Sequence, residues 1–191
     1  MKLIAITGSI GCGKSTLANL LRKLGYLVYD VDVWTRCLYK NEKFNKLILH
    51  SFAEVSKNGK VDKRLLRNIV FNDVNKLRIL ENLIHPFLKQ KLRKVIRKNS
   101  KYDELVFIDA ALIFELGWDK YCNFVVVADV DTDIQKLRVM KRDNISAEDF
   151  NKIVGLQMKN CDKVCFADAV IDTNKSLGLL KIELFKLVRT L

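Results

Sequence analysis

Eight consecutive residues near the start of the sequence, Gly8 to Ser15, fit the pattern G-x-x-x-x-G-K-[ST]. The glycines leave out side chains, so that successive backbone N–H groups can turn towards one anion. Lys14 adds a mobile positive charge for β- and γ-phosphates, and the hydroxyl of Ser15 can bind Mg²⁺. The pattern therefore predicts a nucleoside triphosphate site with the cofactor-binding residues Gly8, Ser9, Ile10, Gly11, Cys12, Gly13, Lys14, Ser15 and Thr16.

Acidic residues end two further segments that have the apolar character of buried strands. Asp30 and Asp32 end the first of them, and Asp109 ends the second. In open α/β sheets the ligand crevice lies beyond the carboxyl ends of the strands, so we expect these carboxylates beside the glycine-rich loop. An apolar strand that ends in Asp109 is the Walker B pattern, in which the carboxylate orients magnesium or its water. Glu115 follows at the same end of the sheet.

The pair Asp30 and Asp32 allows two interpretations. If the strand continues to residue 32, both side chains share one face, where a carboxylate can accept the proton of an attacking hydroxyl or hold metal-bound water. Alternatively, an aspartate caps the helix that we expect to begin at Val33. Both interpretations can hold, one for each aspartate.

Two arginines and a polar helical segment follow the fourth predicted strand. Arg138 and Arg142 have i, i+4 spacing, which places them on one face of a helix. The segment from 143 to 157 begins with Ser146 and Asp149 in the arrangement of a capping box. Such a segment can close over bound phosphates as a lid.

The elements that must position these residues alternate between strands and helices. We expect strands over 2–7, 26–32, 105–109, 124–130 and 169–172, whereas residues 36 to about 101 show helical spacing and no β pattern. Within that block, residues 56–60 form a turn, and Pro86 fits a kink or a fresh helix start. The order predicts an α/β P-loop NTPase fold with three layers (α/β/α), a five-stranded parallel sheet, a helical substrate-binding insertion and a helical lid.

Composition and cysteine usage limit the class of protein. The chain is 49% hydrophobic and 29% charged, as in ordinary globular proteins, and no apolar stretch approaches the ~20 residues of a membrane span. We therefore expect a cytoplasmic protein with no membrane partner. The five cysteines include no C-x-x-C pair, so free thiols are expected. Cys12 is the exception, because the anion-binding loop should favour its thiolate.

The formal net charge of +12 raises the question of nucleic acid binding. The densest basic group, between Lys89 and Lys101, is distributed around a predicted helix among leucines and a valine. A solvated helix face explains this dispersion better than an anion-binding surface, so we expect no nucleic acid partner. A positive field also favours small polyanionic substrates.

Over nearly its whole length the chain resembles the dephospho-CoA kinase family. Many kinases share the glycine-rich loop, whereas the aspartate pair, the His-Pro pair and the Leu-Ile-Phe-Glu run are far more specific in this order and spacing. The residues that carry the resemblance are Thr7 to Ser15, Asp30-Val31-Asp32 with Arg36, Val70-Phe71, His85-Pro86, Asp109 to Glu115, Arg138 with Arg142-Asp143, Gln157, and Ala167 to Asp172. Thr173 departs from the asparagine that is usual there, which puts the local contact to adenine in doubt.

The resemblance implies ATP-dependent phosphorylation of the ribose 3′-hydroxyl of dephospho-CoA, the last step of coenzyme A biosynthesis, with Mg²⁺ as a cofactor. It implies a nucleotide-binding core of residues 1–35 and 102–191, a helical acceptor-substrate domain of residues 36–101, and a lid of residues 142–165 within the core. We expect the small-molecule substrates ATP and dephospho-CoA as the only partners, and a monomer.

The resemblance also assigns roles to individual residues. Asp32 is the expected base near the hydroxyl, and Lys14, Arg138 and Arg142 are the expected phosphate stabilisers. The substrate-binding residues are then Asp30, Asp32, Arg36, His85, Leu112 and Glu115, and the metal ligands are Ser15 and Asp109.

Two other functions fit the same loop: another small-molecule kinase, such as a nucleoside monophosphate kinase, and a nucleotide-binding switch that transfers no phosphate. Asp32 and the paired arginines favour transfer, because a switch needs neither at those places. A GTPase is excluded, since Leu177 stands where Asn-Lys-x-Asp requires its aspartate and Leu112 stands where Asp-x-x-Gly requires its glycine.

Overall fold

The computed structural model describes residues 1–101 and 104–191, and the chain forms two compact units. The core unit consists of Met1–Asp30 and Asn99–Leu191, and the helical unit consists of Val31–Lys98. The first break falls a few residues before the expected one after residue 35, because a helix that begins at Val31 already belongs to the helical unit. The expected start of the second core segment, at residue 102, lies outside the described residues.

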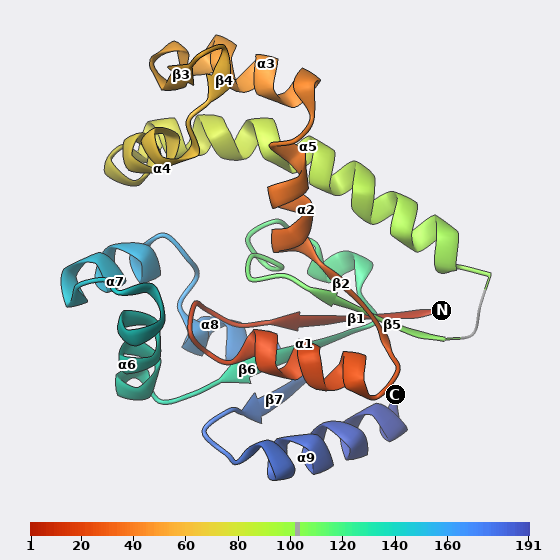
Figure 1. The fold of residues 1–191 in the computed structure, drawn as a ribbon. Coiled ribbons are helices and arrows are strands. Elements are labelled where there is room, and N and C mark those ends of the chain that lie inside the picture. Colours follow the sequence, from red (N-terminus) through yellow and green to blue (C-terminus); the bar gives the residue numbers. More distant parts are fainter. Residues whose placement is uncertain (102–103) are drawn as a thin grey trace. The chain divides into compact units, whose positions relative to one another are not determined.

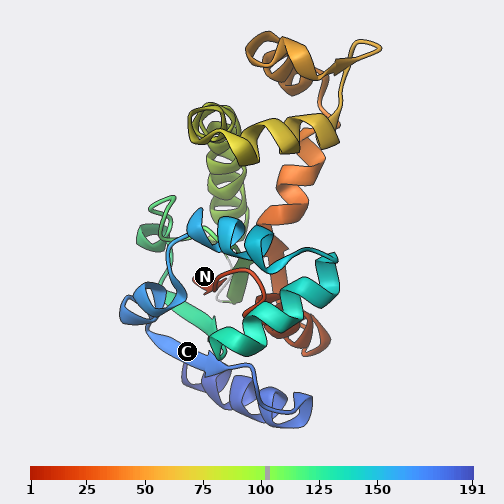
Figure 2. The ribbon, with the colours of Figure 1, turned by 90° about the vertical axis from the view of Figure 1, so that its left-hand side faces the viewer.

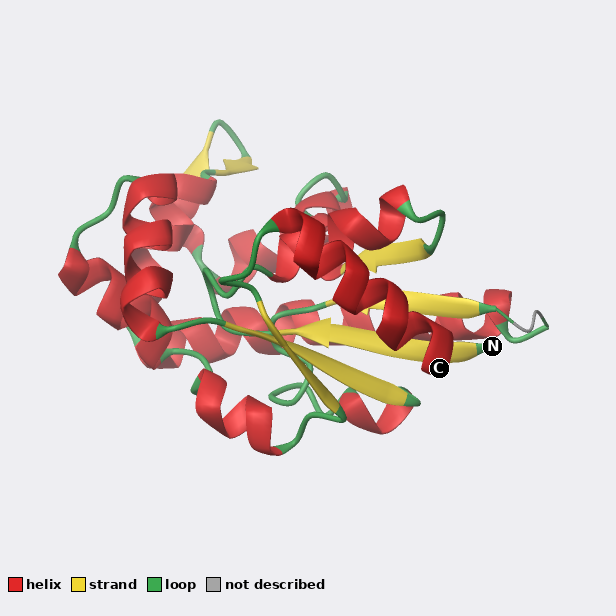
Figure 3. Cartoon of the chain, turned by 90° about the horizontal axis from the view of Figure 1, so that it is seen from below, coloured by secondary structure: helices red, strands yellow, loops and turns green. Residues whose placement is uncertain are grey.

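The core unit is built on one parallel sheet of five strands in the order β2-β5-β1-β6-β7. This confirms the predicted three-layer α/β class (Figures 1 and 3). Its elements are β1 (Lys2–Thr7), α1 (Lys14–Lys23), β2 (Leu27–Asp30), β5 (Leu105–Asp109), η2 (Asp119–Tyr121), β6 (Phe124–Asp129), α6 (Thr132–Asp143), α7 (Ala147–Gly155), α8 (Asn160–Cys165), β7 (Ala169–Asp172) and α9 (Leu177–Thr190).

The connections distribute the helices over both faces of the sheet. The connection from β1 to β2 crosses in one direction and that from β6 to β7 in the other, so right-handed crossovers place α1 and α8 on opposite faces. Helix α9 packs beside α1, and Figure 1 shows both in front of the sheet. Strand β1 is consequently covered on both sides, which explains its unbroken apolar run from Leu3 to Ile6.

The helical unit has an apolar core of its own, to which Phe44, Ile48, Leu66 and Val70 contribute. Its elements are α2 (Val31–Leu38), α3 (Glu42–Ser51), η1 (Ala53–Val55), β3 (Ser56–Lys57), β4 (Lys60–Val61), α4 (Lys63–Asn72) and α5 (Val74–Asn99). Asn41 and Asp62 cap α3 and α4 by accepting hydrogen bonds from backbone N–H groups of the first turn. Such caps stabilise each helix start by about 1 kcal/mol.

Two details of this unit differ from the sequence-based expectation. The segment from 36 to 101 contains a minimal antiparallel hairpin, β3–β4, around Asn58-Gly59, both of which have positive φ. Asn-Gly is a strong hairpin signal, and its flanking strands are too short to show a β pattern. Helix α5 runs without a break through Pro86, so the proline neither begins nor ends a helix.

The second strand is also shorter than expected. Strand β2 ends at Asp30, and Asp32 lies in the first turn of α2. The expectation that both side chains share one strand face is therefore wrong. The helix begins at Val31, two residues before the expected start, so Asp32 lies inside its first turn. A carboxylate in a first helical turn interacts favourably with the unpaired N–H groups there.

Among the described helices, none combines the length and the apolar composition that a bilayer span requires.

Candidate active site

The glycine-rich loop between β1 and α1 has a backbone that only glycine adopts readily. Gly8 has φ 144°, and Gly13, which precedes the first turn of α1, has φ 84°. A Cβ at Gly8 would lie 2.7 Å from the carbonyl oxygen of Ala128, and one at Gly13 would lie 2.6 Å from Oγ1 of Thr173. The glycines are thus required by packing from β6 and β7 as well as by backbone conformation.

The inner part of this loop presents unpaired hydrogen-bond donors. Among the described residues, none accepts a hydrogen bond from the backbone N–H groups of Gly11, Gly13, Lys14 and Ser15. These groups precede or open α1, where the helix dipole also favours negative charge. The arrangement has the geometry of a phosphate cradle.

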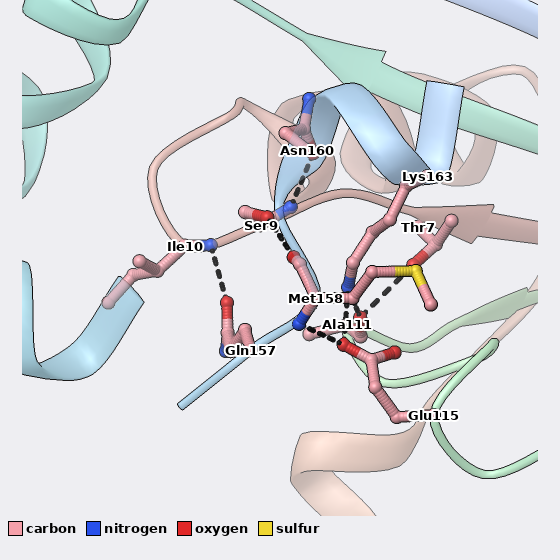
Figure 4. A network of polar contacts seen from close by, with 9 residues as sticks. All are labelled: Thr7, Ser9, Ile10, Ala111, Glu115, Gln157, Met158, Asn160 and Lys163. Carbon is pink, nitrogen blue, oxygen red and sulfur yellow. Dashed lines mark hydrogen bonds and ion pairs between the residues drawn. The ribbon is translucent and has the colours of Figure 1, made fainter. Parts of the chain in front are cut away.

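The outer part of the loop is already occupied by protein side chains. The N–H of Ser9 donates to Oδ1 of Asn160 at 2.8 Å, and the N–H of Ile10 donates to Oε1 of Gln157 at 3.1 Å (Figure 4). The carbonyl oxygen of Ile10 accepts from Nε2 of Gln135 at 2.7 Å. Gln135 lies on α6, Asn160 on α8 and Gln157 between α7 and α8, and Figure 2 shows these helices grouped around the loop. Ser9 and Ile10 therefore use their backbone groups to anchor the loop.

Lys14 and Asp109 form an ion pair below the loop. Nζ of Lys14 lies 2.7 Å from Oδ1 of Asp109, and the two side chains are 14% and 5% exposed. The sheet brings them together because Asp109 is the register partner of Ile6 in β1 and of Asp30 in β2. Three of the predicted site residues, Lys14, Asp30 and Asp109, thus gather at the carboxyl end of the central strands.

The structure separates the two predicted arginines. Both lie on α6, where Nη1 of Arg138 donates to Oγ1 of Thr173 at 3.0 Å and Nη2 donates to the Thr173 carbonyl at 2.9 Å. Arg142 instead forms a bidentate pair with its neighbour Asp143, at 2.7 and 2.8 Å, and hydrogen bonding to that carboxylate raises the pKa of Arg142. Arg138 is therefore held in one orientation next to the loop, whereas Arg142 is exposed.

The predicted acceptor-side residues are divided between the two units. Asp32 and Arg36 are exposed residues one turn apart on α2, and His85 lies half-buried on α5. Burial lowers the pKa of His85, and the Glu81 carboxylate partly opposes this, so the neutral imidazole dominates near pH 7. In the core unit, Leu112 and Glu115 belong to the segment that follows β5.

The expectation for Cys12 is wrong. Its side chain is 1% exposed and packs into the apolar core beneath the loop, against Leu17 and its neighbours. Burial, together with the negative charge of Asp129, raises the pKa of Cys12 to about 11. The backbone of this residue faces the loop while the thiol faces the core, and desolvation disfavours the thiolate.

Three further residues hold the site together: Thr173, which the sequence marked only for its doubtful adenine contact, and Asn160 and Lys163, which no pattern singled out. The hydroxyl of Thr173 donates to the Cys12 carbonyl at 2.9 Å and so links β7, the loop and Arg138. The side-chain amide of Asn160 bridges Ser9 and Asp129, and Lys163 is buried between α8 and the segment after β5. No local pattern marks them, because each acts on partners that are distant in the sequence.

The residues present fit Mg²⁺. Within residues 1–101 and 104–191 there is no group of three or more histidine, cysteine, aspartate and glutamate side chains that could hold a metal ion. Mg²⁺ is usually bound by one or two protein oxygen ligands together with substrate phosphates and water, so such a group is not required. Ser15, exposed in the first turn of α1, and Asp109 supply oxygen donors of this kind.

Known proteins resemble this chain over nearly its whole length. Residues 2–178 match the family model described as dephospho-CoA kinase. A dephospho-CoA kinase of Bartonella henselae is 38% identical over 192 residues, which cover 100% of this chain and 98% of that protein. Among solved structures, one from Thermus thermophilus has a TM-score of 0.84 at 31% identity, covering 100% of this chain and 97% of the other. The dephospho-CoA kinase from Campylobacter jejuni has a TM-score of 0.70 at 27% identity, covering 99% and 96%.

Proposed function

The chain belongs to the dephospho-CoA kinase family, and from this premise we propose how its residues perform the reaction of that family. The reaction transfers a phosphoryl group from ATP to the ribose 3′-hydroxyl of dephospho-CoA and yields coenzyme A and ADP. The observation that carries the assignment to this chain is the cradle of four unpaired N–H groups at the start of α1, in a chain that matches the family over residues 2–178.

We propose that the phosphates of ATP bind to the N–H groups of Gly11, Gly13, Lys14 and Ser15. The ammonium group of Lys14 then exchanges its contact with Asp109 for the β- and γ-phosphates, where it stabilises the charge that develops during transfer. Ser15 and Asp109 would hold Mg²⁺, which supplies further neutralisation of phosphate charge. Ser9 and Ile10 contribute by anchoring the loop, because their N–H groups bind Asn160 and Gln157.

The two arginines receive different roles in this proposal. Arg138 is held by both hydrogen bonds to Thr173, which supports a preorganised contact to a phosphate. Arg142 is exposed, and among the described residues its guanidinium binds the adjacent Asp143 alone. We therefore propose that it engages phosphate when the lid, residues 142–165, closes.

On the acceptor side we propose that Asp32 accepts the proton of the attacking hydroxyl. Its exposed position in the first turn of α2, directly after β2, supports this role. Asp30, Arg36, His85, Leu112 and Glu115 are the proposed contacts to dephospho-CoA, with the helical unit providing the acceptor domain.

One reaction series tests the function. The purified chain is incubated with ATP and Mg²⁺ and with dephospho-CoA, AMP, CMP or adenosine, and products are identified by mass spectrometry. We expect one added phosphoryl group on dephospho-CoA alone. Phosphorylated AMP or CMP would instead indicate a nucleoside monophosphate kinase, and no product with any acceptor would indicate a switch.

A matched pair of variants tests the base. Asp32→Asn keeps the shape of the side chain but loses the proton acceptor, so kcat should fall by ~10²–10⁴ while the KM for ATP stays nearly constant. Asp30→Asn is the control with the same chemical change at the last residue of β2. A larger loss of kcat in Asp30→Asn would reverse the two assignments.

We further propose that the enzyme is a cytoplasmic monomer that requires Mg²⁺ and binds no nucleic acid. Size-exclusion chromatography with light scattering checks the monomer, cell fractionation checks the location, and loss of activity with a chelator, restored by added Mg²⁺, checks the metal requirement.

A further inference from the structure

Lys163, on the short helix α8, has a side chain that is 0% exposed. Its Nζ lies 2.9 Å from Oε1 of Glu115 and 2.5 Å from the carbonyl oxygen of Ala111 (Figure 4). A buried ammonium group is costly unless it is paired and hydrogen-bonded, and here one carboxylate and one carbonyl meet that requirement.

Only one of the two carboxylate oxygens of Glu115 binds other described residues. Its Oε1 accepts from Lys163 and also from the backbone N–H of Met158 at 3.0 Å. Its Oε2 has no hydrogen-bond partner among the described residues and points away from both donors (Figure 4), and the side chain is 23% exposed. The carboxylate is therefore immobilised while one acceptor oxygen remains open to a ligand.

The same lysine connects Glu115 to the phosphate loop. The Ala111 carbonyl that accepts from Lys163 also accepts from Oγ1 of Thr7, the last residue of β1, at 3.2 Å. The carbonyl of Met158 accepts from Oγ of Ser9 at 3.2 Å. Lys163 thus lies at the point where the segment after β5, the residues before α8 and the end of β1 are held together.

We propose that Lys163 is a positioning residue for the acceptor substrate. It orients Glu115 so that Oε2 accepts a hydrogen bond from a hydroxyl or amide donor of dephospho-CoA. This rests on the proposed function, in which Glu115 contacts the acceptor. A lysine with a structural role alone would affect stability and both substrates together, whereas a lysine that acts through Glu115 affects the acceptor selectively.

The test compares steady-state kinetics of three variants. Lys163→Met keeps most of the volume and removes the charge, so Glu115 loses its strongest partner. Loss of a hydrogen bond to a charged group corresponds to about a tenfold to hundredfold change in binding, so the KM for dephospho-CoA should rise by at least tenfold. The KM for ATP and kcat should stay within about twofold, a split that shows removal of acceptor binding alone. Lys163→Arg keeps the charge and should recover much of the acceptor affinity.

Lys175→Met is the matched control, because the exposed Lys175 forms an ion pair with Glu183 on α9 at 2.8 Å, outside the lid. It should leave all constants unchanged. Glu115→Gln should raise the same KM as Lys163→Met, and the double variant should show little further increase, since both changes act through one contact.

The outcomes are separable. A wild-type enzyme that phosphorylates no dephospho-CoA overturns the proposed function and the acceptor role of Glu115 together. An active wild type whose Lys163→Met variant loses only thermal stability, or shows equal increases in both KM values, overturns this inference and leaves the function intact. Should Lys163→Met not fold, Lys163→Gln keeps an N–H donor for the Ala111 carbonyl but removes the charge that holds Glu115, and it must still show a selective rise in the KM for dephospho-CoA.

Discussion

At the scale of single residues, the site is defined by contacts that neutralise buried charge. Lys14 and Asp109 form an ion pair that is largely shielded from solvent, and Lys163 and Glu115 form a second pair in which the lysine is fully buried. Removing one member of such a pair strands the other in a medium that solvates it poorly. Variants of these residues should therefore change both the free energy of unfolding and the catalytic rate, and the two effects can be measured separately.

Lys14→Ala should lower the rate of transfer by about 10²–10³, because it removes a charge that stabilises the transition state. It should also lower the free energy of unfolding by about 1–3 kcal/mol, since Asp109 loses its lysine partner. Turnover and a urea unfolding curve measure the two effects. The double variant Lys14→Met/Asp109→Asn should regain stability without regaining turnover, and near-normal turnover in either variant would remove Lys14 from the mechanism.

Cys12 should react slowly with alkylating reagents in the native enzyme. A thiol with a pKa near 11 is only about 0.1% ionised at pH 8, and the rate should rise steadily as the pH approaches 11, because the thiolate is the nucleophile. Peptide mapping by mass spectrometry after iodoacetamide treatment distinguishes Cys12 from the exposed Cys37, Cys161 and Cys165. Labelling of Cys12 as rapid as that of the exposed cysteines would show that the loop opens readily.

At the scale of elements, the ends of β6 and β7 support the phosphate loop from below. Gly8 lies against Ala128 in β6, and Gly13 lies against Thr173, the residue after β7. Thr173 is 4% exposed, and its hydroxyl and carbonyl serve Cys12 and Arg138 at once. Thr173 is thus a structural link between the loop and α6.

Thr173→Val should impair ATP binding through Arg138, because the isosteric side chain removes the hydroxyl that binds both Cys12 and Arg138. Loss of two buried hydrogen bonds should raise the KM for ATP about tenfold. Thr173→Ser keeps the hydroxyl and should remain close to wild type. Equal ATP kinetics in the two variants would mean that the link has no part in nucleotide binding.

The local signals in the sequence identified most of these elements. The apolar runs at β1, β5, β6 and β7 and the capping box of α7 lie where expected, with Ser146 accepting from the Asp149 N–H. The pattern of residues 26–32 predicts a strand through Asp32, which lies in α2 instead, because apolar alternation does not report where a strand gives way to a helix. The links made by Thr173 and Lys163 were not predictable, because their partners lie far away in the sequence and only tertiary packing selects them.

At the scale of the whole molecule, the net charge of +12 includes basic side chains that are dispersed over an exposed helix surface. On α5, basic side chains such as Lys89 and Arg93 are exposed around a buried stripe that includes Leu88 and Leu92. Lys91 lies over the ring of Trp34 at 5.4 Å, a contact within the helical unit. The exposed charges are thus interleaved with residues engaged in packing.

The enzyme should accordingly bind nucleic acid only weakly. At ~150 mM salt, a gel-shift titration with RNA and DNA oligonucleotides should give dissociation constants no tighter than the ~10⁻⁴–10⁻⁶ M of non-specific contacts. Dephospho-CoA binding should persist under the same conditions. Sub-micromolar affinity for any oligonucleotide would assign a second partner to this chain and direct attention to α5.

The pairing of β2 with β5 has a consequence for biosynthesis. Within the part of the chain that the structure describes, β1 lies between β5 and β6, and β2 pairs with β5 alone. Neither early strand therefore has a partner in the sheet until the ribosome has passed residue 105. The helical unit, Val31–Lys98, is continuous in the chain and has its own core, so it can fold before the sheet is complete. The entropic cost of closing a loop rises slowly with its length, so the helical unit inserted between β2 and β5 destabilises the finished sheet little. It does, however, delay formation of the sheet. The most buried strand of this enzyme therefore spends the longest time exposed, and chaperone dependence during translation should centre on residues 2–7.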